Sequence, residues 1–229
     1  MTAHRAMNSR GRVSMQVWGE AALFTRPEFK AERVTYPCLT PTAAVGVLES
    51  IYWHPGMRYE MDRIEVLKPI AQFAIRRNET SAVPSVRSAL AGKILNTATP
   101  EARTQRMSLC LRDVGYRIHA WIQVLDGADK PLPAYRDQFN RRLRRGACFS
   151  QPYLGSREFV ADFGVLDETP LQQNLDLDMG LMPHSADYDR AGKLVRWNWF
   201  SAELKGGVLD VPRQGLTPSS AESALEAAG

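Results

Sequence analysis

The sequence predicts an α+β fold, with an RRM-like or ferredoxin-like N-terminal domain built on an antiparallel sheet and a small β-rich C-terminal domain. Two patterns predict it. A strand, a helix and further strands follow one another in the first part of the chain, an order that favours an antiparallel sheet covered by helices. Strand patterns then continue in a shorter, acidic part. The expected organisation is a flexible arm (1–12), the RRM-like domain (13–150), the β-rich domain (151–212) and a disordered tail (213–229).

The first two elements have different periodicities. In Val13–Val17, apolar residues alternate with polar ones, which predicts a strand. The segment TPTAAVGVLESIYWHPG (40–56) predicts a helix, because Thr40 suits an N-cap, Pro41 suits the first helical position and Pro55 ends the element. Its apolar residues recur at helical spacing, so we expect one face to be buried.

Three more strands are expected in the N-terminal part. Two of them are Arg58–Leu67 and Ile70–Ile75. The clearest is LRDVGYRIHAWIQVLDG (111–127), in which apolar residues from Val114 to Val124 occupy one face. Residues 78–104 are polar and lack a sustained pattern, so we expect a long loop or projecting excursion there.

Composition excludes several classes of protein. A chain of 229 residues with 44% hydrophobic residues is long and apolar enough to fold, which excludes a mostly disordered protein. No apolar run approaches the roughly 20 residues that span a bilayer, and the N-terminus lacks the apolar region of a secretory signal. The three cysteines form neither a disulfide framework nor a zinc pattern. We expect a cytoplasmic protein without membrane association.

Charge is unevenly distributed along the chain. Residues 1–150 hold 23 Lys and Arg against 13 Asp and Glu, a net +10, whereas residues 151–229 carry a net −6. Of the 29 cations, 23 are Arg. A guanidinium group binds phosphate oxygens in pairs and stacks on bases, so the pattern indicates a polyanion partner, first of all nucleic acid. The alternative is a high-GC coding bias that favours Arg over Lys.

The sharpest local feature is the segment YRDQFNRRLRRG (135–146). It predicts a short helix with Phe139 and Leu143 inward and its arginines largely outward, ended by Gly146. From Lys130 onward this region holds six cations and one anion, which favours phosphate contacts over a merely solvated face. The predicted RNA-binding residues here are Arg136, Arg141, Arg142, Arg144 and Arg145.

Two aromatic groupings are further candidates. On the second face of the strand at 111–127, Arg117, His119 and Trp121 alternate, and a ring beside polar groups is typical of single-stranded RNA readers. Packing of this face under a helix is the competing interpretation. The run Tyr52-Trp53-His54 combines a phenol, an indole and an imidazole, although each is more often a core or capping residue.

No motif indicates a metal, a nucleotide or another cofactor. Asp176 and Asp178 lie in the run DLDLD, but acids at strand ends are usually solvated. The nucleotide-binding, zinc-protease and serine-hydrolase patterns are absent. An enzyme with this sequence is therefore expected to work without a cofactor.

Several consecutive blocks recur, in the same order, in a known family. They are VWGEAALFTRPEFKAERVTY (17–36), TPTAAVGVLESIYWHPG (40–56), IEVLKPI (64–70), IRRNE (75–79), LRDVGYRIHAW (111–121) and FNRRLRRGACFSQPYLGSREFVADF (139–163). From about Val17 to Val211 the chain resembles the CRISPR-associated Cas-five family of subtype I-C, the "d" variant. The resemblance implies the RRM-like and β-rich domains named above.

The resemblance also implies an activity and partners. It implies an endoribonuclease that binds the repeat hairpin of precursor CRISPR RNA, cuts it without a metal and stays on the five-prime handle. The expected partners are precursor and mature CRISPR RNA and the backbone and large subunits of the type I-C surveillance complex. Metal-free cleavage is an attack of a 2′-hydroxyl on the adjacent phosphate, which needs a base, an acid and nearby cations.

The catalytic Tyr of the family motif IYW corresponds to Tyr52. Two positions depart from the family pattern: Ala134-Tyr135 stands where a Lys-His pair is usual, and His54 replaces the Lys after YW. The expected catalytic set is Tyr52, His54 and Tyr135. Other candidates to replace the missing groups are Lys130, Arg136 and Arg142.

Two alternatives to the endoribonuclease stay open at this point. The chain can be a non-catalytic subunit that binds the handle of the CRISPR RNA while another protein processes the precursor, and the departure at Ala134-Tyr135 favours this reading of its role. A general duplex-DNA-binding protein follows from charge alone and predicts little sequence preference.

Overall fold

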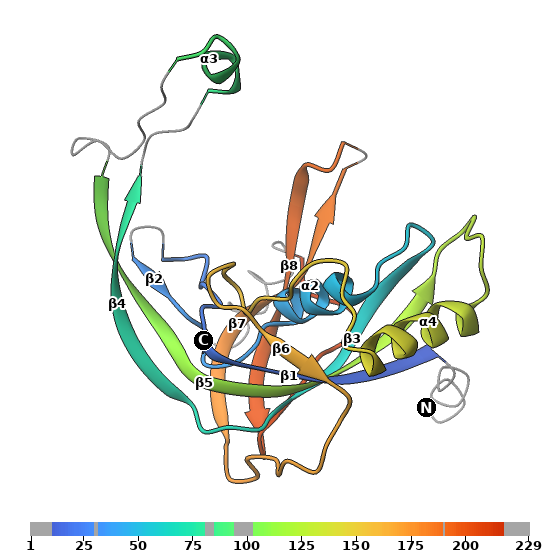
Figure 1. The fold of residues 1–229 in the computed structure, drawn as a ribbon. Helices are drawn as coiled ribbons and strands as arrows, with labels where there is room; N and C mark the ends of the chain where they lie inside the picture. Colours follow the sequence, from blue (N-terminus) through green and yellow to red (C-terminus); the bar gives the residue numbers. More distant parts are fainter. Residues whose placement is uncertain (1–10, 30–31, 81–84, 94–102, 190, 218–229) are drawn as a thin grey trace.

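One curled, mostly antiparallel sheet organises the molecule, and helices α2 and α4 pack against it (Figure 1). The structure is a computed structural model that describes residues 11–29, 32–80, 85–93, 103–189 and 191–217. The elements are β1 (Arg12–Ala22), β2 (Arg33–Val34), α2 (Pro41–Ile51), β3 (Met57–Val66), β4 (Ala71–Thr80), α3 (Val86–Leu90), β5 (Arg103–Val124), α4 (Leu132–Arg144), β6 (Asp162–Gly164), β7 (Leu177–Tyr188), β8 (Leu194–Lys205) and β9 (Val208–Asp210). The predicted α+β class is confirmed.

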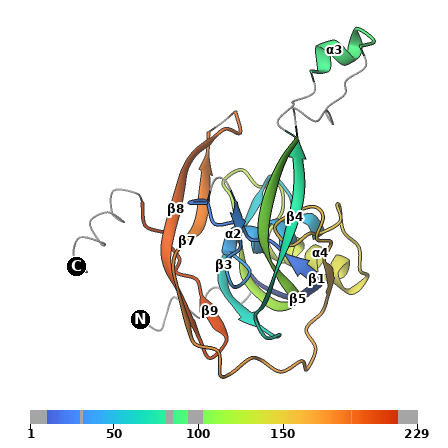
Figure 2. The same cartoon turned by 90° about the vertical axis from the view of Figure 1, so that its left-hand side faces the viewer.

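Strand β5 pairs with neighbouring strands along both of its edges. Along one edge it pairs with β1 from Leu111 to Trp121. Its other edge pairs with β4 over Arg103–Arg112 and with β3 over Tyr116–Val124. One strand thus joins two parts of the sheet, and the β4–β5 and β7–β8 hairpins project in the same general direction (Figures 1 and 2).

The strands nearest the helices follow the expected topology. They lie in the order β6-β1-β5-β3 with antiparallel neighbours, while α2 lies between β1 and β3 in the chain and α4 between β5 and β6. This is the strand order of the ferredoxin-like βαββαβ arrangement. The core beneath the helices includes the fully buried Met15, Ile51, Ile118 and Phe139.

Helix α2 begins as predicted and ends early. Thr40 is its N-cap and accepts a hydrogen bond from the Ala43 amide at 3.3 Å, and Pro41 is the first helical residue. The helix ends at Ile51, four residues before Pro55, because Tyr52 leaves the helical region with φ −152° and ψ 123°. Tyr52 therefore begins the connection to β3 and does not lie on the helix.

Helix α4 buries one side and exposes Arg141 and Arg144, while Arg136 and Arg142 are partly buried. Phe139 and Leu143 are buried as predicted, and Tyr135, one turn earlier, is also buried. Gly146 has a φ of +62°, a conformation that glycine adopts without strain, and it follows the end of the helix.

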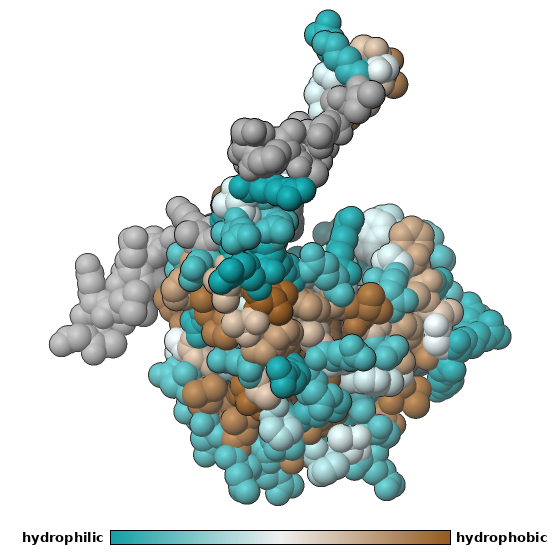
Figure 3. Space-filling view, turned by 60° about the vertical axis from the view of Figure 1, so that its left-hand side comes forward, coloured by the Kyte–Doolittle hydropathy of each residue, from teal (hydrophilic) through white to brown (hydrophobic). Residues whose placement is uncertain are grey.

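The prediction of a long loop or projecting excursion at residues 78–104 is wrong for the residues at its two ends, which are strand. Strand β4 continues to Thr80 and pairs with β5 from Arg103 onward, so the strand expected at Ile70–Ile75 is part of a long hairpin. This stretch is polar on both faces because little covers it, which is why it shows no apolar alternation. Helix α3 lies beyond the hairpin, away from the body (Figures 1 to 3).

The C-terminal strands join the same sheet. β6 pairs with β1 and β9 pairs with β3, and buried residues of β7 and β8, such as Met182 and Phe200, belong to the common core. The division into two domains at residue 151 stays a prediction. Of the predicted arm and tail, residues 1–10 and 218–229 lie outside the described part of the chain, and Leu216 forms a β-bridge with Trp199.

Candidate active site

Tyr52 occupies a defined position at the end of α2. Its amide donates to the Leu48 carbonyl at 3.0 Å, and its own carbonyl accepts a 2.7 Å hydrogen bond from the Tyr59 hydroxyl. Tyr59 lies on β3 and is buried. The sheet therefore fixes the backbone of Tyr52, whose side chain is only partly buried.

His54 lies in the turn that follows. The Gly56 amide donates to its Nδ1 at 3.2 Å, so a neutral His54 carries its proton on Nε2. That Nε2 lies 3.6 Å from Oδ1 of Asp129. The imidazole is thus held between a backbone donor and a carboxylate.

Asp129 connects the turn after α2 with the first turn of α4, and it was not among the site residues predicted from the sequence. Its Oδ1 also accepts a 3.0 Å hydrogen bond from the Tyr135 hydroxyl, and the rings of Tyr135 and His54 lie 5.3 Å apart between centroids. The hydrogen bond from Tyr135 and the nearby His54 hold the pKa of Asp129 below its usual range. The only sequence signal for it was its place in the polar turn just before α4.

The electrostatics of the site keep Tyr52 protonated. Burial and the nearby Asp129 carboxylate raise its pKa above the ordinary phenol value, and Arg142 offsets part of this effect. A neutral phenol at physiological pH donates a hydrogen bond more readily than it accepts a proton. The geometry therefore suits Tyr52 to orienting a reacting oxygen.

The arginines of α4 differ in their surroundings. Arg142 is partly buried, and its Nε is buried without a hydrogen-bond partner in the part of the chain that the structure describes. Arg136 pairs with Asp137 at 2.8 Å, and Arg141 contacts the Gln138 side chain. Arg144 and Arg145 are exposed at the end of the helix.

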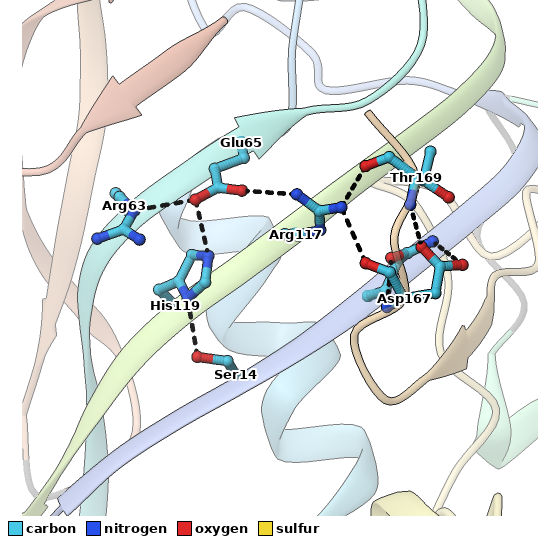
Figure 4. A network of polar contacts seen from close by, with 8 residues as sticks. Ser14, Arg63, Glu65, Arg117, His119, Asp167 and Thr169 are labelled. Carbon is cyan, nitrogen blue, oxygen red and sulfur yellow. Dashed lines mark hydrogen bonds and ion pairs between the residues drawn. The ribbon is translucent and has the colours of Figure 1, made fainter. Parts of the chain in front are cut away.

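Two of the candidates on β5, Arg117 and His119, lie on the opposite face of the sheet from the helices, inside a polar network (Figure 4). His119 is 5% exposed; its Nδ1 lies 2.8 Å from the Ser14 hydroxyl and its Nε2 lies 3.1 Å from Glu65. Arg117 contacts Glu65 at 3.2 Å and the backbone carbonyl of Asp167 at 3.0 Å. A loop after β6, and not a helix, covers Arg117, so the competing interpretation of packing under a helix is wrong for this residue.

Trp121 lies farther along this face, with the Arg12 guanidinium 5.7 Å from the centre of its ring. Asp62 and Glu65 of β3 lie among the cations here, and Asp62 pairs with Arg12 at 3.1 Å. These acids reduce the positive potential that a phosphate backbone needs. RNA contact by Arg117, His119 and Trp121 stays a prediction, and the structure does not bring them near Tyr52.

Metal-ligating and membrane features were also sought. In the described residues, no group of three or more His, Cys, Asp or Glu side chains is placed to hold a metal ion. Asp176 and Asp178 accept hydrogen bonds from the amides of Gly206 and Gly180. None of the described helices is long and apolar enough to cross a membrane.

Comparison with known proteins identifies the family. The family described as "CRISPR-associated protein (Cas_Cas5)", in its Cas5d form, matches residues 13–212, and the chain belongs to this family. The resemblance found in the sequence is confirmed.

Two curated relatives share its length. A "CRISPR pre-crRNA endoribonuclease Cas5d" of Mannheimia succiniciproducens is 40% identical over 216 residues, covering 88% of this chain and 95% of the relative. A protein of the same name in Thermus thermophilus is 46% identical over 171 residues, covering 75% of this chain and 71% of the relative.

Two solved structures share the fold. One, described as a CRISPR-associated protein, has a TM-score of 0.65 at 20% identity and covers 89% of this chain and 92% of its own. The other, the functionally uncharacterised SMU1763c of Streptococcus mutans, has a TM-score of 0.61 at 17% identity over 88% and 92% of the two chains.

Proposed function

We propose that this protein is a pre-crRNA endoribonuclease that cuts the repeat RNA of its CRISPR locus without a metal. The observation that carries the proposal is the position of Tyr52 at the end of α2, beside His54, Asp129 and the partly buried Arg142. Both curated relatives are named for the same activity, which supports the proposal. The RRM-like domain, residues 13–150, supplies the whole of this cluster.

The reaction is an in-line attack of a 2′-hydroxyl on the neighbouring phosphorus. The new P–O bond forms as the bond to the 5′-oxygen breaks, leaving a 2′,3′-cyclic phosphate and a 5′-hydroxyl. One group accepts the proton of the 2′-hydroxyl and another supplies a proton to the leaving oxygen. His54 holds an imidazole nitrogen toward Asp129 and can donate or accept a proton there, so it takes a proton-transfer role, while Tyr52 orients a reacting oxygen.

Tyr135 acts through Asp129. It is fully buried, and its hydroxyl is already donated to that carboxylate. It therefore positions Asp129, and through it His54, and does not meet the RNA. Arg142 is near enough to Tyr52 to offset part of the rise in its pKa, and its guanidinium is suited to the charge that develops on the phosphate. Arg136, Arg141, Arg144 and Arg145 bind phosphates outside the reacting centre.

The product stays bound in the proposed function. A basic helix beside the cut favours retention of the five-prime handle, in a cytoplasmic complex with the backbone and large subunits of the type I-C system. Retention and these partners are what membership of the family implies.

One observation favours the alternative, a handle-binding subunit without nuclease activity. The family's Lys-His pair is replaced by Ala134-Tyr135, and buried Tyr135 does not present a new proton donor to solvent. In that case binding would be tight and cleavage absent.

The test is incubation of the purified protein with the repeat RNA of its locus in EDTA, beside Tyr52→Phe. We expect one cut at the hairpin base by the wild type, a loss of at least about 100-fold in the variant, and binding within a few-fold. Tyr188→Phe is the control, since Tyr188 is 62% exposed on β7. Tight binding without a cut would support the alternative, and equal binding to random duplex DNA would support a general DNA-binding protein.

A further inference from the structure

Two large aromatic side chains stand exposed beside the candidate active site. Trp53 is 55% exposed and Phe149 is 86% exposed. Burying a ring of this size is favourable, so a folded protein rarely leaves two of them in water at one place unless that place binds something. Neither ring takes part in the catalytic roles assigned above.

The backbone brings the two residues to the same end of α2. Trp53 follows Tyr52 directly. The Phe149 amide donates a 2.7 Å hydrogen bond to the carbonyl of Ser50, and the Ser150 amide reaches the same oxygen at 3.2 Å. The segment after α4 is thereby fastened two residues before Tyr52, and its aromatic side chain is left in solvent.

The surroundings indicate the chemistry of the ligand. Phe149 follows the exposed Arg144 and Arg145 by a few residues, so the segment that carries its ring begins at a cationic helix end. A purely apolar protein segment would have to desolvate these guanidinium groups. A nucleotide satisfies both features, because its base has an apolar π face and its phosphate is an anion.

We propose that Trp53 and Phe149 form a stacking site for unpaired nucleobases of the repeat RNA next to the cleaved bond. This inference rests on the proposed function and adds a second source of affinity to it. Phosphate contacts hold the backbone, while stacking holds the bases that flank the reacting phosphate in one orientation. Stacking is independent of ionic strength, unlike the contribution of the arginines.

The experiment uses the full-length protein and repeat RNA with a 2′-deoxy nucleotide at the cleaved position, which binds but cannot form the nucleophile. 2-Aminopurine replaces each base flanking that position in turn. Wild-type binding should quench its fluorescence, and Trp53→Leu and Phe149→Leu should each weaken binding about 5- to 150-fold and reduce the quenching. The logarithmic salt slope of the affinity should stay unchanged.

Aromatic replacements separate stacking from general apolarity. Trp53→Phe and Phe149→Tyr should retain most of the affinity and quenching. Val195→Ala, at a valine 67% exposed on β8, is the control for an exposed apolar residue elsewhere. Thermal melting checks that each variant folds.

Three outcomes would overturn the inference. If wild-type protein binds and cuts the repeat RNA and the leucine variants do so equally well, the stacking site is wrong and the proposed function stands. If the leucine variants retain their RNA affinity but lose a contact with another subunit, the two rings belong to a protein interface. If wild-type protein does not bind the repeat RNA, both fail.

Discussion

The hydroxyl of Tyr59 donates a 2.7 Å hydrogen bond to the backbone carbonyl of Tyr52. The donor comes from the middle of the sheet, and the acceptor is the first residue after α2. The end of a helix is otherwise free to fray. This hydrogen bond holds the backbone of Tyr52 in place, and so it fixes the direction in which the Tyr52 side chain points. It links the catalytic candidate to the core.

Replacing Tyr59 with Phe should disturb the active site, although the Tyr59 side chain is buried and does not contact the RNA. Loss of the hydrogen bond should lower the free energy of unfolding by about 1 kcal/mol. The single-turnover cleavage rate should fall while the affinity for cleavage-resistant RNA stays the same. Urea unfolding and quench-flow kinetics measure the two effects, and an unchanged rate in a destabilised variant would show that Tyr59 is merely structural.

Arg142 and Arg144 provide a matched pair on one helix. Arg142→Gln should lower the cleavage rate at saturating RNA about tenfold or more, because the lost charge faced Tyr52 and the reacting phosphate. Arg144→Gln removes one exposed charge, so it should mainly weaken binding and reduce the salt slope by about 0.7 to 0.9. Salt titrations and saturating kinetics distinguish them, and equal effects on rate would contradict the distinction.

Two glycines give opposite expectations. Gly46 lies within α2 with open space around its missing Cβ, so Gly46→Ala should raise the free energy of unfolding by about 0.5–1 kcal/mol. A Cβ at Gly56 would lie 2.9 Å from that of Ala128 and closer still to the Tyr135 hydroxyl. Gly56→Ala should therefore destabilise the protein and slow cleavage by moving Tyr135 from Asp129. Stabilisation by both changes would contradict this packing.

The network around His119 predicts a stability that depends on pH. Burial and the neighbouring Arg63 lower the pKa of His119, although Glu65 opposes this. In the unfolded chain the imidazole takes up its proton near pH 6.5, whereas the folded protein resists it to lower pH. The free energy of unfolding should therefore fall as the pH drops below about 6.5, by at most about 1.4 kcal/mol per pH unit.

His119→Gln should flatten that dependence. The variant has no imidazole to protonate, so its urea midpoint should change less between pH 7 and pH 5 than that of the wild type. Glu65 titrates in a lower window: burial raises its pKa, but hydrogen bonds from Arg117 and Arg63 outweigh this and leave it below the ordinary value. Equal pH slopes in both proteins would remove His119 as the cause.

Local sequence patterns predicted the strands and helices whose formation depends on residues close together in the chain. The alternation of Val114 to Val124 and the Thr40-Pro41 start of α2 are visible in the sequence, because burial on one face and capping at one end depend on nearby residues. The inward Phe139 and Leu143 were predictable for the same reason. The family itself followed from the order of sequence blocks.

The pairing of distant residues depended on the tertiary structure. Nothing near Asp129 in the sequence shows that it meets His54, since that contact arises from the antiparallel pairing of β3 and β5, whereas its partner Tyr135 is only six residues away in the chain. The same pairing places Glu65 against Arg117 and His119, two contacts that the sequence did not predict. The sequence alone established the periodicity of the strands, the helix caps, the distribution of charge and the family. Which charged side chains meet was decided only in the tertiary structure, because ion pairs act over a few ångströms and many of them join residues far apart in the chain.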